Sequence, residues 1–169
     1  VHVIHGTYAE TVFHERSGTA GNPITYWADP GVVMTGRPET LTTAYSAFSL
    51  GARNYIVIDG FTITNTTSKG IYVDASNHVT ITNNHVSHAG APSLIHPYEQ
   101  GIYMRNTTYS TISGNTTDHN TCIGIRVVGG NNNLISNNTS YSNYSVVETD
   151  AAGIELTGSS YNTVINNLT

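Results

Sequence analysis

The chain has 169 residues, of which 38% are hydrophobic and 10% are charged, and its formal net charge at pH 7 is -5. Disordered chains combine few aliphatic residues with high net charge, so this composition predicts a folded domain, and the mild acidity excludes a nucleic-acid-binding protein, which needs a basic stripe. No apolar run approaches the ~20 residues of a membrane helix, and a single cysteine, Cys122, excludes an internal disulfide framework.

The first third of the chain, residues 1–50, predicts N-terminal coils of short strands. Strand-like runs alternate with Gly and Pro turns at Val1–Ile4, Thr11–Phe13, Ile24–Trp27 and Val32–Met34. The opening "VHVIHGTY" reads as a strand already under way, and the closing "NTVINNLT" reads as mid-repeat. We therefore expect one domain, residues 1–169, that is a fragment of a longer repeat protein.

Residues 51–169 contain a regular repeat. The segments "GIYVDASNHVTITNN", "GIYMRNTTYSTISGN", "GIRVVGGNNNLISNN" and "GIELTGSSYNTVINN" begin at Gly70, Gly101, Gly124 and Gly153 and align without a gap. An earlier half-unit, "NYIVIDGFTITN", starts at Asn54 and puts Phe61 in the place of the last Asn. The motif is constant and the spacing between motifs varies, as expected for fixed strands joined by turns of different length.

Three positions of the motif predict how the repeats stack. The fourth is aliphatic (Val73, Met104, Val127, Leu156), the twelfth is aliphatic (Ile81, Ile112, Ile135, Val164), and the fifteenth is Asn (Asn84, Asn115, Asn138, Asn167). Apolar spacing of two indicates strands rather than helices, and hairpin turns of the Asn-Gly type are missing. The pattern predicts a parallel β-helix whose coils stack ~4.8 Å apart. The Asn column predicts a ladder of amides, at a turn where Asn tolerates left-handed backbone.

The opening segments resemble a known family. "GTYAETV", "SGTAGNPITYWADPG" and "NYIVIDGFTITN", together with the Gly-Ile units, resemble the secreted right-handed parallel β-helix proteins, which include pectate-lyase-like and chondroitinase-B-like polysaccharide lyases. The resemblance covers nearly the whole chain and implies an all-β, single-stranded right-handed parallel β-helix (solenoid) with an Asn ladder. It also implies a secreted or cell-surface protein. The matching residues are turn and core residues, so they specify the fold more than the chemistry.

Side-chain alternation predicts a functional face. If Ile125 and Val127 point inward, Arg126 and Val128 point outward. The outward columns are then Tyr72, Tyr103, Arg126, Glu155 and, next to it, Asp74, Arg105, Val128, Thr157. Tyrosines stack on sugar rings and Arg binds a carboxylate at two points, so this face predicts binding of a polysaccharide, in particular an acidic one.

Two long turns, which follow Asn84 and Asn138, bracket a shorter one and are expected to rim a cleft above the Arg126 strand. The first carries His96 and Glu99, predicted to bind substrate together with Tyr72 and Tyr103. The second carries Glu148 and Asp150. The histidines show no regular metal-ligand spacing, which favours structural or surface roles.

The resemblance to lyases implies β-elimination on a uronic acid, with Ca²⁺ or Arg neutralising the carboxylate and Lys or Arg as base. Arg126 and Arg105 are the candidates, whereas Lys69 is expected two coils from Arg126 and therefore poorly placed. Glu148, Asp150 and Glu155 are candidate calcium ligands, without a recognised loop pattern. Hydrolysis would instead use two carboxylates, either Asp150 with Glu155 or Glu99 with Glu155.

A second hypothesis is a non-catalytic extracellular module of a surface layer, adhesin or self-assembling filament. Open ends of a β-helix expose strand edges, which predicts end-to-end self-association. The outward column of tyrosine, arginine and carboxylate favours the first hypothesis, because a plain scaffold does not need it.

Overall fold

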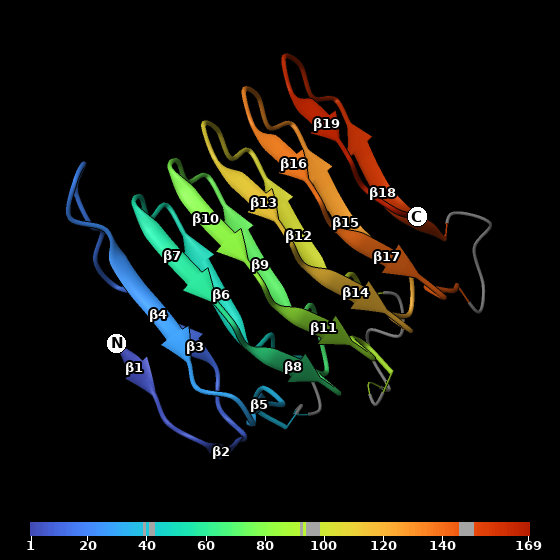
Figure 1. Ribbon diagram of the computed structural model, residues 1–169. Coiled ribbons are helices and arrows are strands. Elements are labelled where there is room, and N and C mark those ends of the chain that lie inside the picture. Colours follow the sequence, from blue (N-terminus) through green and yellow to red (C-terminus); the bar gives the residue numbers. More distant parts are fainter. Residues whose placement is uncertain (39, 41–42, 92, 94–98, 146–150) are drawn as a thin grey trace.

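The computed structural model describes residues 1–38, 40, 43–91, 93, 99–145 and 151–169, and its strands form three parallel sheets. The chain visits the sheets in a constant order, so that every third strand returns to the same sheet (Figure 1). Each strand pairs with the equivalent strands of the coils before and after it. This arrangement confirms the predicted all-β parallel solenoid.

The sheets are named A, B and C in the order in which the chain enters them. Sheet A contains β1 (His2–Val3), β4 (Ile24–Ala28), β7 (Ile56–Asp59), β10 (Val79–Thr82), β13 (Thr111–Ser113), β16 (Leu134–Ser136) and β19 (Thr163–Ile165). Sheet B contains β2 (Gly6–Tyr8), β5 (Val32–Met34), β8 (Thr62–Thr64), β11 (His85–Ser87), β14 (Thr116–Asp118) and β17 (Thr139–Tyr141). Sheet C contains β3 (Val12–Phe13), β6 (Phe48–Gly51), β9 (Ile71–Asp74), β12 (Ile102–Arg105), β15 (Ile123–Val128) and β18 (Ala152–Thr157).

The core is a set of aliphatic columns inside the coils. The predicted columns are in register, since Val73, Met104, Val127 and Leu156 pair in series on sheet C, and Ile81, Ile112, Ile135 and Val164 do so on sheet A. Near the N-terminal end the core becomes aromatic, with Phe48 and Phe61 edge to face at 5.0 Å between ring centroids. Full burial of side chains of this kind stabilises a fold by about 1.5–3 kcal/mol each.

The predicted amides form a continuous chain of hydrogen bonds. Nδ2 of Asn84 donates to Oδ1 of Asn115 at 3.0 Å, and the same contact recurs from Asn115 to Asn138 and from Asn138 to Asn167. Each Oδ1 also accepts from the backbone N–H of the preceding member, and Phe61 N–H does the same with Asn84 at 3.0 Å. The column therefore satisfies its buried polar groups from within, which a low-dielectric interior requires.

The left-handed residue of this turn is not the one that we expected. Positive φ angles occur one position earlier, at Gly60, Asn83, Gly114, Asn137 and Asn166. The ladder Asn follows, with its amide turned into the coil. The two residues of each Asn-Asn pair in the sequence thus have different roles. The first adopts the left-handed backbone conformation, and the side chain of the second forms the ladder.

A second amide ladder lies at the turn from sheet B to sheet C. Asn120 Nδ2 donates to Asn143 Oδ1 at 2.9 Å, and Asn143 Nδ2 donates to Thr117 O at 3.3 Å. The amide of Asn143 is thus bonded into the coil stack. As in the first ladder, the residue just before each Asn has positive φ, namely His119 and Ser142.

No helix in the described ranges is long and apolar enough to span a membrane. The opening "VHVIHGTY", which we expected to be one strand, forms two, because β1 ends at Val3 and β2 begins at Gly6. End-to-end self-association stays a prediction.

Candidate functional site

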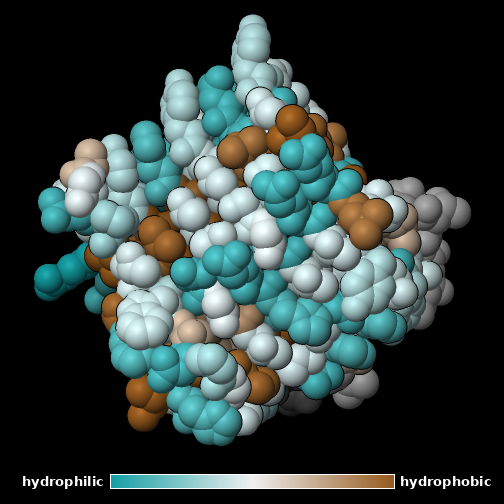
Figure 2. Space-filling view, in the orientation of Figure 1, coloured by the Kyte–Doolittle hydropathy of each residue, from teal (hydrophilic) through white to brown (hydrophobic). Residues whose placement is uncertain are grey.

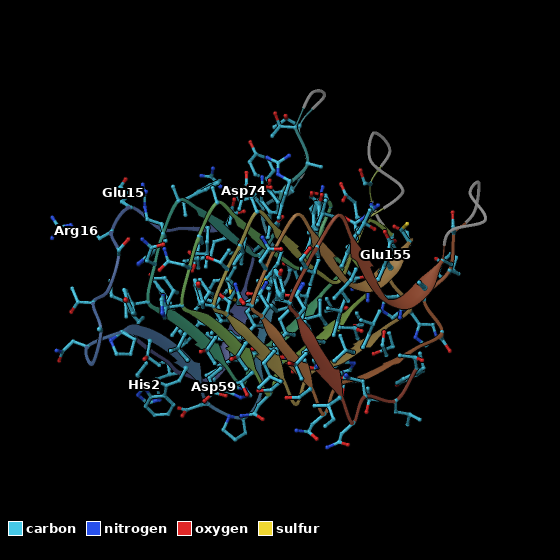
Figure 3. The ribbon with its side chains drawn as sticks, turned by 90° about the horizontal axis from the view of Figure 1, so that it is seen from above. His2, Glu15, Arg16, Asp59, Asp74 and Glu155 are labelled. Atoms are coloured by element: carbon cyan, nitrogen blue, oxygen red, sulfur yellow. The ribbon has the colours of Figure 1, made fainter. Side chains whose placement is uncertain are left out.

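The outward face of sheet C has the predicted columns. Tyr103 pairs with Tyr72 on one side and with Arg126 on the other, and Arg126 pairs with Glu155. In the neighbouring column Arg105 lies between Asp74 and Val128. Figure 3 shows Asp74 and Glu155 along one side of the molecule and His2 and Asp59 along the other, so the candidate face is separated from sheet A.

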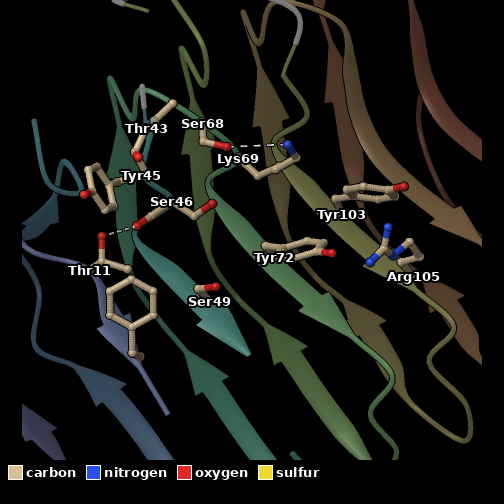
Figure 4. A pocket seen from close by; sticks show the side chains of 12 residues that line it. Thr11, Thr43, Tyr45, Ser46, Ser49, Ser68, Lys69, Tyr72, Tyr103 and Arg105 are labelled. Carbon is tan, nitrogen blue, oxygen red and sulfur yellow. Dashed lines mark hydrogen bonds between the residues drawn. The ribbon is translucent and has the colours of Figure 1, made fainter. Parts of the chain in front are cut away.

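A pocket of about 350 Å³ lies on this face, over β6, β9 and β12. Figure 4 shows the rings of Tyr72 and Tyr103 beside the Arg105 guanidinium, with Lys69 at the upper edge of the pocket. Its walls are Thr11, Phe13, Thr43, Ala44, Tyr45, Ser46, Ser49, Ser68, Lys69, Tyr72, Tyr103 and Arg105. Hydroxyl groups, aromatic rings and two cations therefore meet in one concave surface.

The position of this pocket differs from the predicted cleft. We expected a cleft above the Arg126 strand, rimmed by two long turns. Parts of both turns lie outside the described residues, so that cleft stays a prediction, and the pocket found among the described residues lies nearer the N-terminus. Residues 43–46 form one wall, just before β6, and Ser68 and Lys69 occupy the equivalent place just before β9. Sequence reasoning missed this wall because residues 1–50 do not carry the Gly-Ile motif that set the register elsewhere.

Lys69, the only lysine of the sequence, is a pocket residue. Our expectation that it is poorly placed was made relative to Arg126, but it lies in the same pocket as Arg105. Its Nζ forms an ion pair with Glu99 Oε2 at 2.6 Å and lies 6.0 Å from the centroid of the Tyr72 ring. Lys69 and Arg105 thus provide the pair of cations that the sequence alone did not reveal.

Glu99, predicted to bind substrate, lies beneath the surface. Its side chain is only 4% exposed, and Oε1 accepts a hydrogen bond from Ser68 Oγ at 3.2 Å. A buried carboxylate needs a counter-charge, and Lys69 supplies it. Glu99 therefore holds Lys69 in place, and any contribution to binding is indirect.

Arg105 is held by a two-point contact with Asp74. Its Nε and Nη2 donate to the two carboxylate oxygens at 3.0 and 2.5 Å. The hydrogen bonds from Arg105 hold the pKa of Asp74 below its ordinary value. Burial, reinforced by the negative charge of Asp74, raises the pKa of the Tyr72 hydroxyl, which keeps that tyrosine neutral. The side chain of Arg105 is 47% exposed, so it remains accessible to a ligand.

Arg126 lies one coil further along. Its Nη2 is 3.2 Å from Glu155 Oε1, and its guanidinium carbon is 5.9 Å from the centroid of the Tyr103 ring. Its Nε is buried and has no hydrogen-bond partner among the described residues. Glu155 also accepts a hydrogen bond from Thr157 Oγ1. Arg126 and Glu155 are therefore a pair, so each neutralises the other's charge.

The charges of this face are balanced. Lys69, Arg105 and Arg126 have as partners Glu99, Asp74 and Glu155, respectively. The described residues of this face therefore create no strong positive field, and an anionic ligand must compete with the internal carboxylates for the cations. Selectivity for an acidic sugar would then come from geometry rather than from net charge.

Several predicted residues are outside the described part of the chain. His96, Glu148 and Asp150 lie outside the described residues, so their substrate and calcium roles stay predictions. No three His, Cys, Asp or Glu side chains of the described residues are grouped as a metal site. Glu155, the third predicted calcium ligand, has Arg126 and Thr157 as its neighbours. Both carboxylate pairs proposed for hydrolysis include Glu155, and they stay predictions.

A second polar cluster lies on sheet B. His85 Nε2 and His119 Nδ1 form hydrogen bonds of 2.5 and 2.7 Å to the two oxygens of Asp118. His88 stacks on His119 with a centroid distance of 5.3 Å. Burial raises the pKa of Asp118, but the hydrogen bonds from His119 and His85 outweigh this effect and hold the pKa below its ordinary value. These histidines support a buried carboxylate.

The fold and its ladders define a parallel β-helix. Residues 21–169 match the family model described as the right handed beta helix region, and the chain therefore belongs to that family. A comparison with curated proteins found no sequence match.

Three solved structures are similar. A pectate lyase, Pel9A, gives a TM-score of 0.60 at 16% identity over 94% of this chain and 54% of its own. A rhamnogalacturonan lyase gives a TM-score of 0.57 at 15% identity over 95% of this chain and 54% of its own. The enzymatically active domain of tailspike protein 2 from bacteriophage CBA120 gives a TM-score of 0.53 at 13% identity over 86% of this chain and 22% of its own. The chain spans about half of each lyase and less of the tailspike domain, and at these identities the likeness shows the fold alone.

Proposed function

We propose that this β-helix is a secreted or cell-surface protein that binds an acidic polysaccharide in the pocket over β6, β9 and β12. The observation that carries the proposal is the pocket itself, in which the neighbouring rings of Tyr72 and Tyr103 are accompanied by two cations, Lys69 and Arg105. Two of the similar structures are named as lyases of pectate and rhamnogalacturonan, which supports a uronate-containing chain as the ligand.

Each group of the pocket has a part in binding. Arg105 uses Nε and Nη2 for Asp74, and the guanidinium has further N–H donors for a sugar carboxylate. The rings of Tyr72 and Tyr103 are 5.6 Å apart and inclined by 37°, which offers successive surfaces for sugar rings along the helix axis. Hydroxyl groups such as Ser49 and Thr43 supply hydrogen-bond partners at the walls.

Binding of oligogalacturonate, measured by isothermal titration calorimetry, tests the proposal. Arg105→Ala is expected to weaken binding by about 10- to 100-fold, the value of a hydrogen bond to a charged group. Asp74→Asn should strengthen binding, because it removes the carboxylate that competes for Arg105. The matched control is Arg16→Ala, an exposed arginine that is not a pocket residue. Equal affinity of Arg105→Ala and wild type would reject the site.

Cleavage by β-elimination is the second candidate, because Lys69 and Arg105 share the pocket. Arg105 would neutralise the uronate carboxylate while neutral Lys69 removes the proton on the adjacent carbon. The electron pair forms a C=C bond, the bond to the glycosidic oxygen breaks, and that oxygen takes a proton from water.

The ultraviolet absorbance of unsaturated uronate products measures this reaction. Polyuronates and glycosaminoglycans are tested with and without Ca²⁺, which also tests the predicted role of Glu148, Asp150 and Glu155. The variant is Lys69→Met combined with Glu99→Gln, since loss of Lys69 alone would leave a buried carboxylate unpaired. No product from wild type at any pH would exclude cleavage, and ordered fibres in electron micrographs without polysaccharide binding would instead favour the structural module.

A further inference from the structure

The turn from sheet C to sheet A contains a column of residues in the left-handed conformation. Their φ angles lie between 51° and 57°, and the residues are Tyr55, His78, Tyr109, Asn132 and Tyr161. Backbone hydrogen bonds set the register, since each member donates to the residue just before the next member, for example Tyr109 to Asn131 O and Asn132 to Ser160 O, both at 3.3 Å. Figure 1 shows these turns in a row, between the ends of β9, β12, β15 and β18 and the starts of β10, β13, β16 and β19.

Four of these five residues are aromatic, which the backbone does not explain. Bulky side chains are uncommon at positive φ, where Asn and Gly are preferred. The ladder turn before Asn84 and its equivalents uses Asn and Gly at this place. Aromatic rings are thus placed here against the local backbone preference, as is typical of a functional surface.

The aromatic rings stack on one another until the column is interrupted. Tyr55 and His78 are 4.6 Å apart at 17°, and His78 and Tyr109 are 5.7 Å apart at 20°. Asn132 then takes the next place, and Tyr161 the one after it. Two coil steps of ~4.8 Å put Tyr109 and Tyr161 about 9.6 Å apart, so a ring above Asn132 would lie about 4.8 Å from each, within the range of stacked pairs.

An open hollow of about 490 Å³ occupies this gap. Leu134, which is 38% exposed, is an apolar wall residue, and Thr111 and Thr163 contribute hydroxyl groups. The described residues that line the hollow are His78, Tyr109, Ser110, Thr111, Asn132, Asn133, Leu134, Tyr161 and Thr163, and none of these is Asp, Glu, Lys or Arg. In Figure 2, pale to mildly hydrophilic side chains stand out at the upper edge, where Figure 1 places these turns.

We propose that this hollow is a second glycan-binding site, in which one neutral pyranose ring stacks between Tyr109 and Tyr161 above Asn132. A pyranose has C–H groups on its faces for the two tyrosine rings and hydroxyl groups at its edge for Asn132, Thr111 and Thr163. A uronate is disfavoured because the lining residues that the structure describes offer its carboxylate no Lys or Arg partner. The site uses none of the residues of the pocket on sheet C and does not rest on the function proposed for that pocket.

Filling the gap tests the proposal. Asn132→Tyr should complete the stack and exclude the sugar, and the chain already tolerates tyrosine at this φ in Tyr55, Tyr109 and Tyr161. The matched control is Asn137→Tyr, an exposed Asn of the next turn with a φ of 56°. The probes are cellohexaose, xylohexaose, mannohexaose and chitohexaose, titrated by calorimetry against the intact chain.

We expect at least one neutral hexasaccharide to bind, Tyr109→Ala to weaken binding roughly three- to tenfold, and Asn132→Tyr to abolish it. Asn137→Tyr and Arg105→Ala should bind like wild type, which separates this site from the pocket on sheet C. The proposal is overturned if no probe binds, or if Asn132→Tyr binds as wild type does. It is also overturned if sedimentation velocity shows a dimer that Asn132→Tyr dissociates, because the occupant would then be a second copy of the chain.

Discussion

Gly124→Ala should destabilise the protein by at least about 3 kcal/mol, at the upper end of the effects of overpacking. A Cβ at Gly124 would lie 2.7 Å from Gly153 O and would collide with the hydroxyl groups of Thr117 and Ser140. The same geometry recurs in the column, because a Cβ at Gly70 would lie 2.7 Å from Gly101 O and one at Gly101 would lie 2.8 Å from Gly124 O. A backbone oxygen cannot move aside as a flexible side chain can, so the repeated Gly of the Gly-Ile motif is required by close contact between coils.

Urea unfolding followed by circular dichroism measures this effect as a shift of the midpoint. The matched control is Gly51→Ala, where an added Cβ meets no atom within 4 Å and φ is not in the left-handed range. This control should be neutral or slightly stabilising, since alanine restricts the unfolded chain more than glycine does. A Gly124→Ala variant that unfolds at the wild-type midpoint would contradict the close packing of the coils.

Asn115→Ala should lower the free energy of unfolding by about 3–5 kcal/mol, because it leaves several buried polar groups without partners. Asn115 is 1% exposed. Its Oδ1 accepts from the backbone N–H and from Nδ2 of Asn84, both at 3.0 Å, and its Nδ2 donates to Ile81 O at 2.9 Å. Removal of one amide therefore interrupts the ladder in both directions.

The control for this variant is Asn22→Ala, at an exposed Asn outside the ladders. Its expected effect is within about 0.5 kcal/mol, as for most surface substitutions. Both variants are compared by the same urea titration. If Asn115→Ala and Asn22→Ala have equal midpoints, the ladder does not contribute to stability, and its residues are turn residues only.

Most of the fold is predictable from the sequence, because the coil repeats a short motif whose periodicity has one structural solution. The alternation Ile125, Arg126, Val127 is enough to place Arg126 outward, and the structure confirms its pairing with Tyr103 and Glu155. The ladder formed by Asn120 and Asn143 was missed although the two residues occupy equivalent places in neighbouring coils. The reason is that β14 and β17 carry few aliphatic residues, so their register was not evident.

The site was less predictable than the fold. The outward columns follow from strand alternation, whereas the pocket depends on residues 43–46 and Lys69, which precede strands in turns of variable length. Sequence does not show that the buried Glu99 holds Lys69, since the pair is separated by a full coil and depends on how the turn folds back. The positions of charged side chains on strands could be predicted from the sequence, and the positions of charged side chains in turns could not.

A crystal structure of the protein with a short oligogalacturonate tests the central claim most directly. We predict that the sugar chain lies along sheet C over Tyr72 and Tyr103, with one carboxylate hydrogen-bonded to the Arg105 guanidinium. An oligogalacturonate bound to a different face, or bound on sheet C without contact to Arg105 and the two tyrosines, would contradict the account.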